Sequence, residues 1–207
     1  MDNNLNLYKA KLPYPPIVVA KPNKHYAEII QVNFAGAVSE FSAISQYINH
    51  HFRTENQYPE ISKTLEHIAI LEKYHIEILG KLIIKLGGNP GYWINKKDKK
   101  LNWSPHFINY GLNVTEMINY DINDEKVAIK QYISTQKKID DSNIISIIDR
   151  IILDEEVHIQ ILTELSKKYQ NIYLNARKDG NEILCYIGID KKYRIYTKDS
   201  YYENISD

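Results

Sequence analysis

Apolar residues recur with the 3.6-residue period of amphipathic helices along four segments of the chain. The predicted helices span residues 23–52, 59–86, 112–139 and 143–168. Asn23 is placed to cap the first helix, and Pro59 suits the first position of the second. The glycine-rich segment 87–91 ends the second helix, and residues 140–142 form a turn and cap before the fourth. Four amphipathic helices of this length predict an all-α four-helix bundle.

The segments around these helices have a different character. Residues 1–22 contain four prolines, which oppose regular helix and indicate an extended arm on the surface. Residues 89–111 fit a long crossover between helices 2 and 3, which joins two helical hairpins. After the bundle of residues 23–170, the tail of residues 171–207 contains three β-prone runs, at 172–176, 183–189 and 193–197. Because Asp179-Gly180 is a hairpin signal, the tail is expected to form a small antiparallel meander on the bundle or on a neighbouring subunit.

Four glutamates lie within the apolar stripes of the predicted helices: Glu40, Glu72, Glu125 and Glu155. A buried carboxylate is costly unless it is paired or bound to a cation. The alternative is that all four lie on the solvent side of the helices. Their spacing argues against this, because Glu40 and Glu72 are 32 residues apart and Glu125 and Glu155 are 30 residues apart. Two helical hairpins would then present glutamates at matching places.

Two of these glutamates begin Glu-x-x-His motifs, Glu72 to His75 and Glu155 to His158. Residues i and i+3 share one face of a helix, so each motif aims a carboxylate and an imidazole at one point. The chain order is therefore Glu, Glu-x-x-His, Glu, Glu-x-x-His. Four carboxylates and two imidazoles in a bundle core predict a centre for two divalent ions, iron or manganese.

Three further residues are candidates for supporting these ligands. Asp154 precedes Glu155, and it is placed to accept a hydrogen bond from His75 across the bundle. The alternative is that Asp154 is a solvated aspartate on the helix surface. Tyr47 and Tyr132 each lie seven residues beyond a glutamate on the same helical face. They are candidates either for hydrogen bonds to carboxylates beside the metals or for plain core packing.

Composition narrows the classes of function. Lysine and arginine balance aspartate and glutamate at 26 each, so no basic surplus favours nucleic acid. The start of the chain is polar and does not resemble a signal peptide, and no run of 18 apolar residues indicates a membrane span. Cys185 is the single cysteine, which excludes intrachain disulfides and a four-cysteine metal centre. We expect a cytoplasmic protein.

Two segments resemble a known family. Residues 35–40, Ala-Gly-Ala-Val-Ser-Glu, and residues 43–47, Ala-Ile-Ser-Gln-Tyr, resemble the first metal-binding helix of the rubrerythrin and manganese-catalase branch of the ferritin-like superfamily. Residues 154–158, Asp-Glu-Glu-Val-His, resemble the last such helix. The similarity covers about residues 25–168. It implies a ferritin-like bundle with Glu40 and Glu125 as terminal ligands, Glu72 and Glu155 as bridging ligands, and one metal each for His75 and His158.

The resemblance also implies a dimetal oxidoreductase that acts on hydrogen peroxide or dioxygen, with an electron donor that the sequence does not identify. Two features depart from rubrerythrin: the chain lacks the paired Cys-x-x-Cys motifs of a rubredoxin domain, and Ala128 stands where an additional glutamate is expected. A ferroxidase or iron-storage protein is one alternative, and a structural protein of the spore-coat type is another. A homodimer or a higher homo-oligomer is expected.

Overall fold

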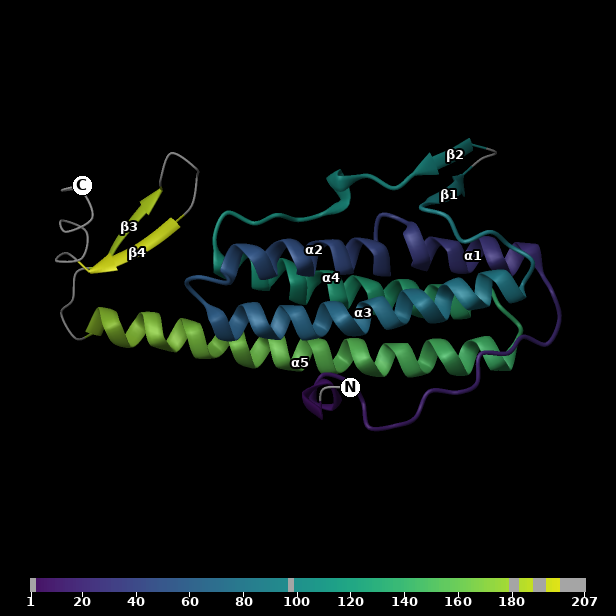
Figure 1. The fold of residues 1–207 in the computed structure, drawn as a ribbon, viewed down its shortest axis with the longest axis horizontal. Coiled ribbons are helices and arrows are strands. Elements are labelled where there is room, and N and C mark those ends of the chain that lie inside the picture. The colour runs from purple at the N-terminus through teal and green to yellow at the C-terminus, as the bar shows by residue number, and fades with distance from the viewer. Residues whose placement is uncertain (1–2, 97–98, 179–182, 188–192, 198–207) are drawn as a thin grey trace.

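The segments with helical periodicity form long helices that pack side by side as a bundle (Figure 1). The computed structural model describes residues 3–96, 99–178, 183–187 and 193–197, with side-chain environments for residues 5–96 and 99–169. The α-helices of these regions are α1 (Lys24–Ala35), α2 (Glu40–Thr54), α3 (Pro59–Lys85), α4 (Val114–Gln136) and α5 (Ser142–Lys178). In Figure 1, α1 and α2 follow one another along one edge of the bundle, and the other helices run alongside them. The all-α, ferritin-like prediction is confirmed.

The first predicted helix, residues 23–52, is interrupted between α1 and α2. The backbone N–H of Gly36 donates to Val32 O at 2.9 Å, and α1 ends there. A Cβ at position 36 would lie 2.5 Å from that carbonyl oxygen, so the close approach requires glycine. Ser39 then caps α2 by accepting a hydrogen bond from Ser42 N at 3.2 Å. The break makes Glu40 the first residue of α2.

The crossover between α3 and α4 contains a small hairpin that the sequence analysis did not predict. Strands β1 (Trp93–Lys96) and β2 (Lys99–Asn102) pair antiparallel, with Trp93 opposite Asn102. A short 3₁₀ helix, η2 (Pro105–Phe107), follows. The Trp103 indole donates to Ser42 Oγ at 2.9 Å and so ties the crossover to α2.

Residues 3–22 lie against the bundle and include a short 3₁₀ helix, η1 (Asn3–Leu7). Tyr14, Ile17 and Val19 pack against the apolar core. The backbone N–H of Ala20 donates to Asp141 Oδ2 at 2.7 Å. These contacts cover one side of the bundle with the arm.

The predicted β run at residues 172–176 is wrong, because α5 continues to Lys178. No glycine or proline interrupts the chain between residues 142 and 178, so nothing local ends the helix there and weak β propensity is overridden. Strands β3 (Ile183–Ile187) and β4 (Tyr193–Thr197) pair antiparallel, so the meander is reduced to a hairpin. The Asp179-Gly180 signal lies outside the described residues. The division of the chain at residues 22 and 170 stays a prediction.

The buried apolar residues form two clusters along the bundle. The first joins α1, α3, α4 and α5 and includes Ile30, Phe34, Leu79, Leu82, Tyr132, Ile144, Ile148 and Ile151. The second joins α2, α3, α4 and α5 and includes Tyr47, Leu65, Ile68, Ile118 and Leu162. Along α3 the charged pair Glu72 and His75 lies between the two clusters, and along α5 Glu155 and His158 do the same. A charged layer therefore crosses the middle of an apolar core.

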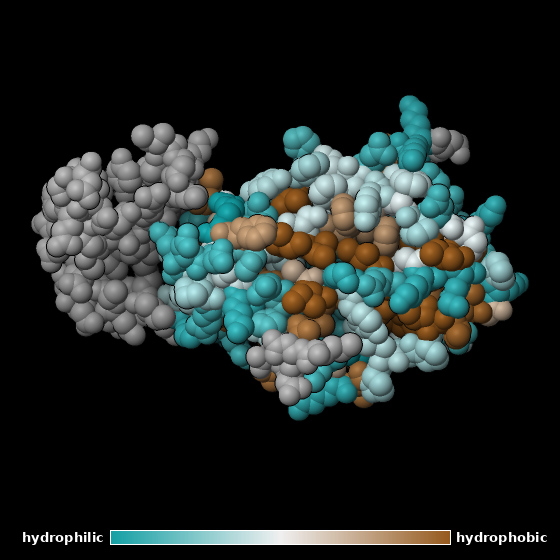
Figure 2. All heavy atoms as spheres, in the orientation of Figure 1, coloured by the Kyte–Doolittle hydropathy of each residue, from teal (hydrophilic) through white to brown (hydrophobic). Residues whose placement is uncertain are grey.

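The surface carries hydrophobic side chains in bands between hydrophilic ones (Figure 2). On α3, Ile84 is 61% exposed and Ile70 is 44% exposed. Exposed apolar residues in bands are typical of surfaces that associate with other proteins. Among the described residues, no helix has both the length and the apolar content needed to cross a membrane.

Candidate metal centre

The six predicted ligand side chains converge on one place in the bundle. Two overlapping groups bring carboxylate oxygens and one imidazole nitrogen within 4.8 Å of one another: Glu40, Glu72, His75 and Glu155 in the first, and Glu72, Glu125, Glu155 and His158 in the second. Glu72 and Glu155 belong to both groups. The geometry thus offers two adjacent positions for cations, with two carboxylates shared between them.

Each helix delivers its side chains by simple local geometry. Glu40 is the first residue of α2, where the Ser39 cap sets its direction. The i and i+3 spacing places Glu72 with His75 on one face of α3, and α5 repeats the arrangement. All six residues are between 0% and 3% exposed. The predicted burial of these polar side chains within apolar stripes is therefore present in the fold.

Around the first position, His75 Nδ1 lies 3.1 Å from Glu72 Oε2, 3.4 Å from Glu155 Oε1 and 3.5 Å from Glu40 Oε2. In an octahedral site with metal–ligand bonds of about 2.1 Å, neighbouring ligand atoms are roughly 3.0 Å apart. The observed distances approach those along the edge of such a polyhedron. They are longer than most strong hydrogen bonds between charged groups.

The second position has nearly the same geometry. His158 Nδ1 lies 3.0 Å from Glu72 Oε1, 3.1 Å from Glu155 Oε2 and 3.4 Å from Glu125 Oε1. Among the described residues, Glu72 Oε1 and Glu155 Oε1 are buried and accept no hydrogen bond. Buried carboxylate oxygens without donors are costly, and a cation removes that cost. The donor set and these oxygens fit a pair of iron or manganese ions.

The two candidate tyrosines bond across the bundle. The Tyr47 hydroxyl of α2 donates to Glu125 of α4, and the Tyr132 hydroxyl of α4 donates to Glu40 of α2. Both rings are buried. Each tyrosine therefore holds the glutamate of the opposite helix, not the glutamate seven residues before it in its own helix.

Asp154 is fully buried, which excludes the solvated alternative. Its Oδ2 lies 3.2 Å from His75 Nε2, so the contact expected across the bundle is present. Two residues around it were missed by the sequence analysis: the Tyr14 hydroxyl donates to Asp154, and Arg150 Nη1 donates to its Oδ1 at 2.5 Å. The spacing of Arg150, four residues before Asp154, is a helical signal that was available.

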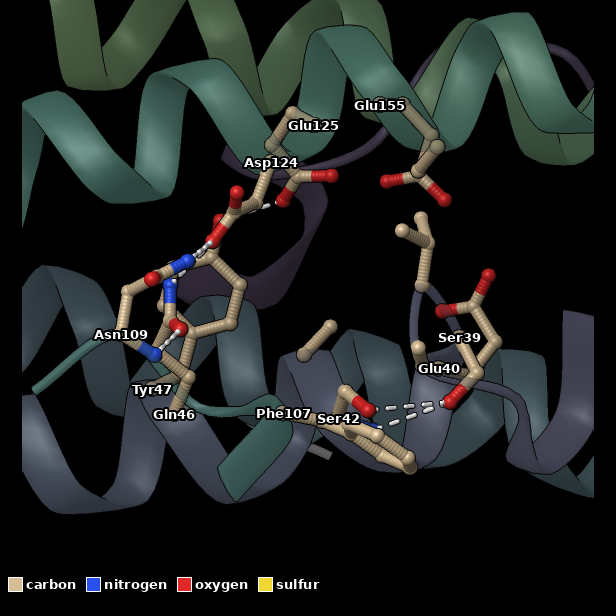
Figure 3. A pocket seen from close by; sticks show the side chains of 14 residues that line it. Ser39, Glu40, Ser42, Gln46, Tyr47, Phe107, Asn109, Asp124, Glu125 and Glu155 are labelled. Atoms are coloured by element: carbon tan, nitrogen blue, oxygen red, sulfur yellow. Dashed lines mark hydrogen bonds between the residues drawn. The ribbon is translucent and has the colours of Figure 1, made fainter. Parts of the chain in front are cut away.

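A cavity of about 200 Å³ opens beside the centre, between α2, α4 and the crossover. Figure 3 shows Glu40, Glu125 and Glu155 pointing toward the same space. Phe107 and Asn109 of the crossover form part of its wall. The remaining lining includes small side chains such as Ala37, Ala43 and Ala128. The cavity connects the carboxylates with the outer side of the bundle.

The wall beside this cavity is fixed by a second buried polar network. His50 Nδ1 lies 2.9 Å from Asp121 Oδ1, and His50 Nε2 lies 2.8 Å from the Asn109 carbonyl oxygen. The Gln46 amide donates to Asp121 and to Asp124, both at 2.9 Å. The network joins α2, α4 and the crossover, a combination that the helical patterns did not predict.

Comparison with known proteins agrees with this geometry. Residues 28–166, which make up 139 of the 207 residues, match the family model described as rubrerythrin. The chain belongs to the rubrerythrin family. This confirms the resemblance noted in the sequence. The rubrerythrin-family chain is also 26% identical to a bacterioferritin of Desulfovibrio desulfuricans over 150 residues. This alignment covers 70% of this chain and 78% of the bacterioferritin.

Solved structures share the fold. The manganese catalase KatB from Anabaena has a TM-score of 0.69 and 23% identity, covering 78% of this chain and 80% of its own. The bacterioferritin of Desulfovibrio desulfuricans, described with a diiron site, has a TM-score of 0.57 and 24% identity, covering 71% of this chain and 81% of its own.

A second family model, described as immunity factor for SPN, matches residues 161–207 of this chain.

Electrostatics in this rubrerythrin-family centre favour bound protons when cations are absent. Burial raises the pKa of Glu40 to about 8, and the charge of Glu72 adds to the rise. Burial, followed by the charges of Glu155 and Glu72, raises the pKa of Glu125 well above its usual range. Glu40 is thus held in the neutral form near pH 7, and the pKa of Glu125 is shifted in the same direction.

Both imidazoles also favour the protonated form, whereas Asp154 favours the ionised form. Burial opposes protonation of His75, but the charges of Glu155 and Glu72 outweigh it and raise its pKa. His158 behaves in the same way, with hydrogen bonds to Glu125 among the causes that raise its pKa. Burial also opposes ionisation of Asp154, yet hydrogen bonds led by that from His75 keep its pKa below the usual range. Metal binding would displace the protons on the glutamates and imidazoles.

Proposed function

We propose that this rubrerythrin-family protein is a dimetal oxidoreductase that holds two iron or manganese ions and acts on hydrogen peroxide or dioxygen. The observation that carries the proposal is the pair of overlapping donor groups, buried between two apolar clusters and sharing Glu72 and Glu155. An ordinary structural role does not require four carboxylates and two imidazoles in a bundle core, where their desolvation is costly.

We assign the residues as follows. Glu72 and Glu155, which belong to both donor groups, would serve as the bridging ligands, Glu40 and Glu125 would be terminal ligands, and His75 and His158 would each present Nδ1 to one ion. These assignments use the nitrogen and oxygen atoms that face one another in each group. When bound, the metal pair supplies two-electron redox chemistry.

Two tyrosines, the apolar clusters and the cavity would support that chemistry. Burial, followed by the charge of the glutamate that each faces, raises the pKa values of Tyr47 and Tyr132, so each hydroxyl remains a donor that orients its glutamate. The apolar clusters on both sides exclude water. The cavity of about 200 Å³ has room for several molecules the size of water, which suits a substrate as small as peroxide or dioxygen.

The test begins with metal identity. The metal-free protein is loaded separately with iron or manganese, and bound metal is counted by elemental analysis. We expect two ions per chain in the wild type and at most one in the His75→Ala variant, while the exposed His25→Ala control retains two. Loaded protein is then assayed for oxygen release from hydrogen peroxide and for peroxide reduction with a supplied reductant. A wild type that binds no iron or manganese, or that is inert to peroxide and dioxygen when loaded, refutes the proposal.

The similarity to a bacterioferritin supports a second candidate, a ferroxidase that serves iron storage. In that case Fe(II) is the substrate, and the loaded protein oxidises many equivalents of it. The discriminating measurement is the iron content after aerobic addition of excess Fe(II). Retention of tens of iron atoms per chain selects storage, whereas retention of two selects the enzyme.

We also infer that the protein is a homo-oligomer, with a dimer as the simplest form. The inference is supported by exposed apolar side chains such as Ile84 and Ile70 on α3. Light scattering after size-exclusion chromatography measures the mass directly. A mass of 24.2 kDa, that of one chain, would contradict it.

A further inference from the structure

The two imidazoles of the proposed centre differ on the side that faces away from the glutamates. His75 Nε2 lies 3.2 Å from Asp154 Oδ2 and 3.1 Å from the Tyr14 hydroxyl. His158 Nε2 is buried and has no hydrogen-bond partner among the residues whose side chains are described. The two metal positions have nearly equivalent ligand atoms, but they differ in the hydrogen-bond partners of the histidine Nε2 atoms.

The sequence contains the origin of this difference. The two Glu-x-x-His motifs repeat the same arrangement on α3 and α5, so the residues that precede them are equivalent by spacing. Asp154 precedes Glu155, but Leu71 precedes Glu72. Leu71 is buried and its side chain has no hydrogen-bond acceptor. One half of the repeat therefore carries a carboxylate where the other half carries a hydrocarbon.

Asp154 is held in place from several directions. Arg150 Nη1 donates to its Oδ1 at 2.5 Å, and Ala10 N donates to the same oxygen at 2.7 Å. Arg150 also donates through Nε to Leu12 O at 2.6 Å and through Nη2 to Ala10 O at 2.8 Å. Its guanidinium lies 4.1 Å from the centre of the Tyr14 ring. The N-terminal arm thus fixes the acceptor that faces His75.

A hydrogen bond on one imidazole nitrogen decides what the other nitrogen can do. A metal on Nδ1 requires the ring proton to be on Nε2. For His75 that proton has Asp154 as its acceptor, so the ring is oriented before metal arrives. For His158 the same proton would lie buried without an acceptor in the described part of the chain, which disfavours the metal-binding form.

We propose that Asp154, fixed by Arg150 and the N-terminal arm, is a positioning residue that makes the two metal positions unequal, with the His75 position binding a divalent ion at least tenfold more tightly. This rests on the proposed dimetal centre. Removing the carboxylate or carbonyl partner of a metal-bound imidazole usually weakens binding by roughly 10- to 100-fold. The difference between the two positions is expected to fall in that range.

The experiment is a calorimetric titration of the full-length, metal-free protein with Mn²⁺. The wild type is expected to bind in two separate steps, and at one equivalent its electron paramagnetic resonance spectrum is that of isolated Mn²⁺. His158→Ala should retain the tighter step, and His75→Ala should retain only the weaker one. Asp154→Asn is then added to each of these variants.

In the His158→Ala background, Asp154→Asn should weaken Mn²⁺ binding by about 10- to 100-fold. In the His75→Ala background it should leave the affinity unchanged, which a merely structural effect would not achieve. Tyr14→Phe, which removes one donor to Asp154 and leaves the carboxylate, provides a milder second test with the same direction. Equal affinities in the two histidine variants, or equal weakening of both by Asp154→Asn, would overturn the inequality and leave the dimetal centre intact. Failure of every form to bind Mn²⁺, Fe²⁺ or Co²⁺ would overturn both.

Discussion

The metal-free protein is expected to lose stability as the pH rises from 6 to 9, and the metal-loaded protein is not. Burial raises the pKa of Glu40 from 4.5 to about 8 in the folded chain. A group whose pKa is raised on folding stabilises the fold below its unfolded pKa, and this contribution is lost as the pH rises through the folded value. Glu125, His75 and His158 also have raised pKa values, so their contributions change in the same direction.

The magnitude follows from Glu40 alone. Each pH unit between 4.5 and 8 removes about 1.4 kcal/mol from the free energy of unfolding, because only the folded state keeps the proton. Because Glu40 is half titrated in the folded chain at pH 8, the loss between pH 6 and pH 8 is roughly 2 kcal/mol, and little more is lost by pH 9. For a chain of this size, that corresponds to a fall in Tm of about 5–9 °C. The three other groups increase the fall.

Calorimetric Tm values at pH 6, 7, 8 and 9, with and without two equivalents of Mn²⁺, measure the effect. The matched variants are Glu40→Gln, which should flatten the profile of the metal-free protein, and Glu77→Gln, an exposed change that should leave it unaltered. Bound metal takes the place of the protons, so the loaded protein should gain stability over the metal-free form as pH rises. A metal-free Tm that stays constant or rises from pH 6 to pH 9 would refute the reasoning.

Four further substitutions have defined outcomes. Tyr132→Phe removes a buried donor from a carboxylate and should lower the free energy of unfolding by about 1–3 kcal/mol, measured in urea. Gly36→Ala would place a methyl group 2.5 Å from a backbone oxygen and should lower it by roughly 1–3 kcal/mol, whereas Gly80→Ala, inside α3 with its nearest contact at 3.4 Å, should raise it by about 0.5–1 kcal/mol. Ala128→Phe fills the cavity and should slow peroxide consumption at least tenfold with two metals still bound.

The two stability predictions have controls in the same chain, and metal content controls the third. Tyr74→Phe alters an exposed ring, so a loss of stability as large as that of Tyr132→Phe would show that the effect is not specific to the buried hydroxyl. Equal effects of the two glycine substitutions would contradict the steric account of the break between α1 and α2. Loss of metal in Ala128→Phe would mean that the cavity supports the ligands and does not serve as an entry route.

Much of the site could be predicted because its information is local. The i and i+3 pairs Glu72 with His75 and Glu155 with His158 depend only on helical geometry. Glu40 and Glu125 were found because apolar neighbours at helical spacing imply burial. The overlap of the two donor groups then follows from packing the helices side by side. Iron and manganese could not be separated, since both favour the same oxygen and nitrogen donors.

The features that were missed depend on contacts between distant segments. Tyr14 reaches Asp154 over 140 positions of sequence, and no periodicity in a proline-rich arm encodes that path. The break at Gly36 was hidden because the apolar pattern continues through it, and only the tight approach to Val32 O reveals it. The His50 network likewise forms where α2, α4 and the crossover meet.

The charged layer between the two apolar clusters has a consequence for how the chain opens. Hydrocarbon contacts stabilise each end of the bundle independently, whereas the middle turns of α3 and α5 are joined by groups that attract cations and otherwise compete for protons. Local opening begins where packing is weakest. A chelator should therefore accelerate deuterium uptake first at the amides near residues 72–75 and 155–158. The amides at both ends of the bundle should stay protected for longer, because their protection depends on apolar packing and not on bound metal.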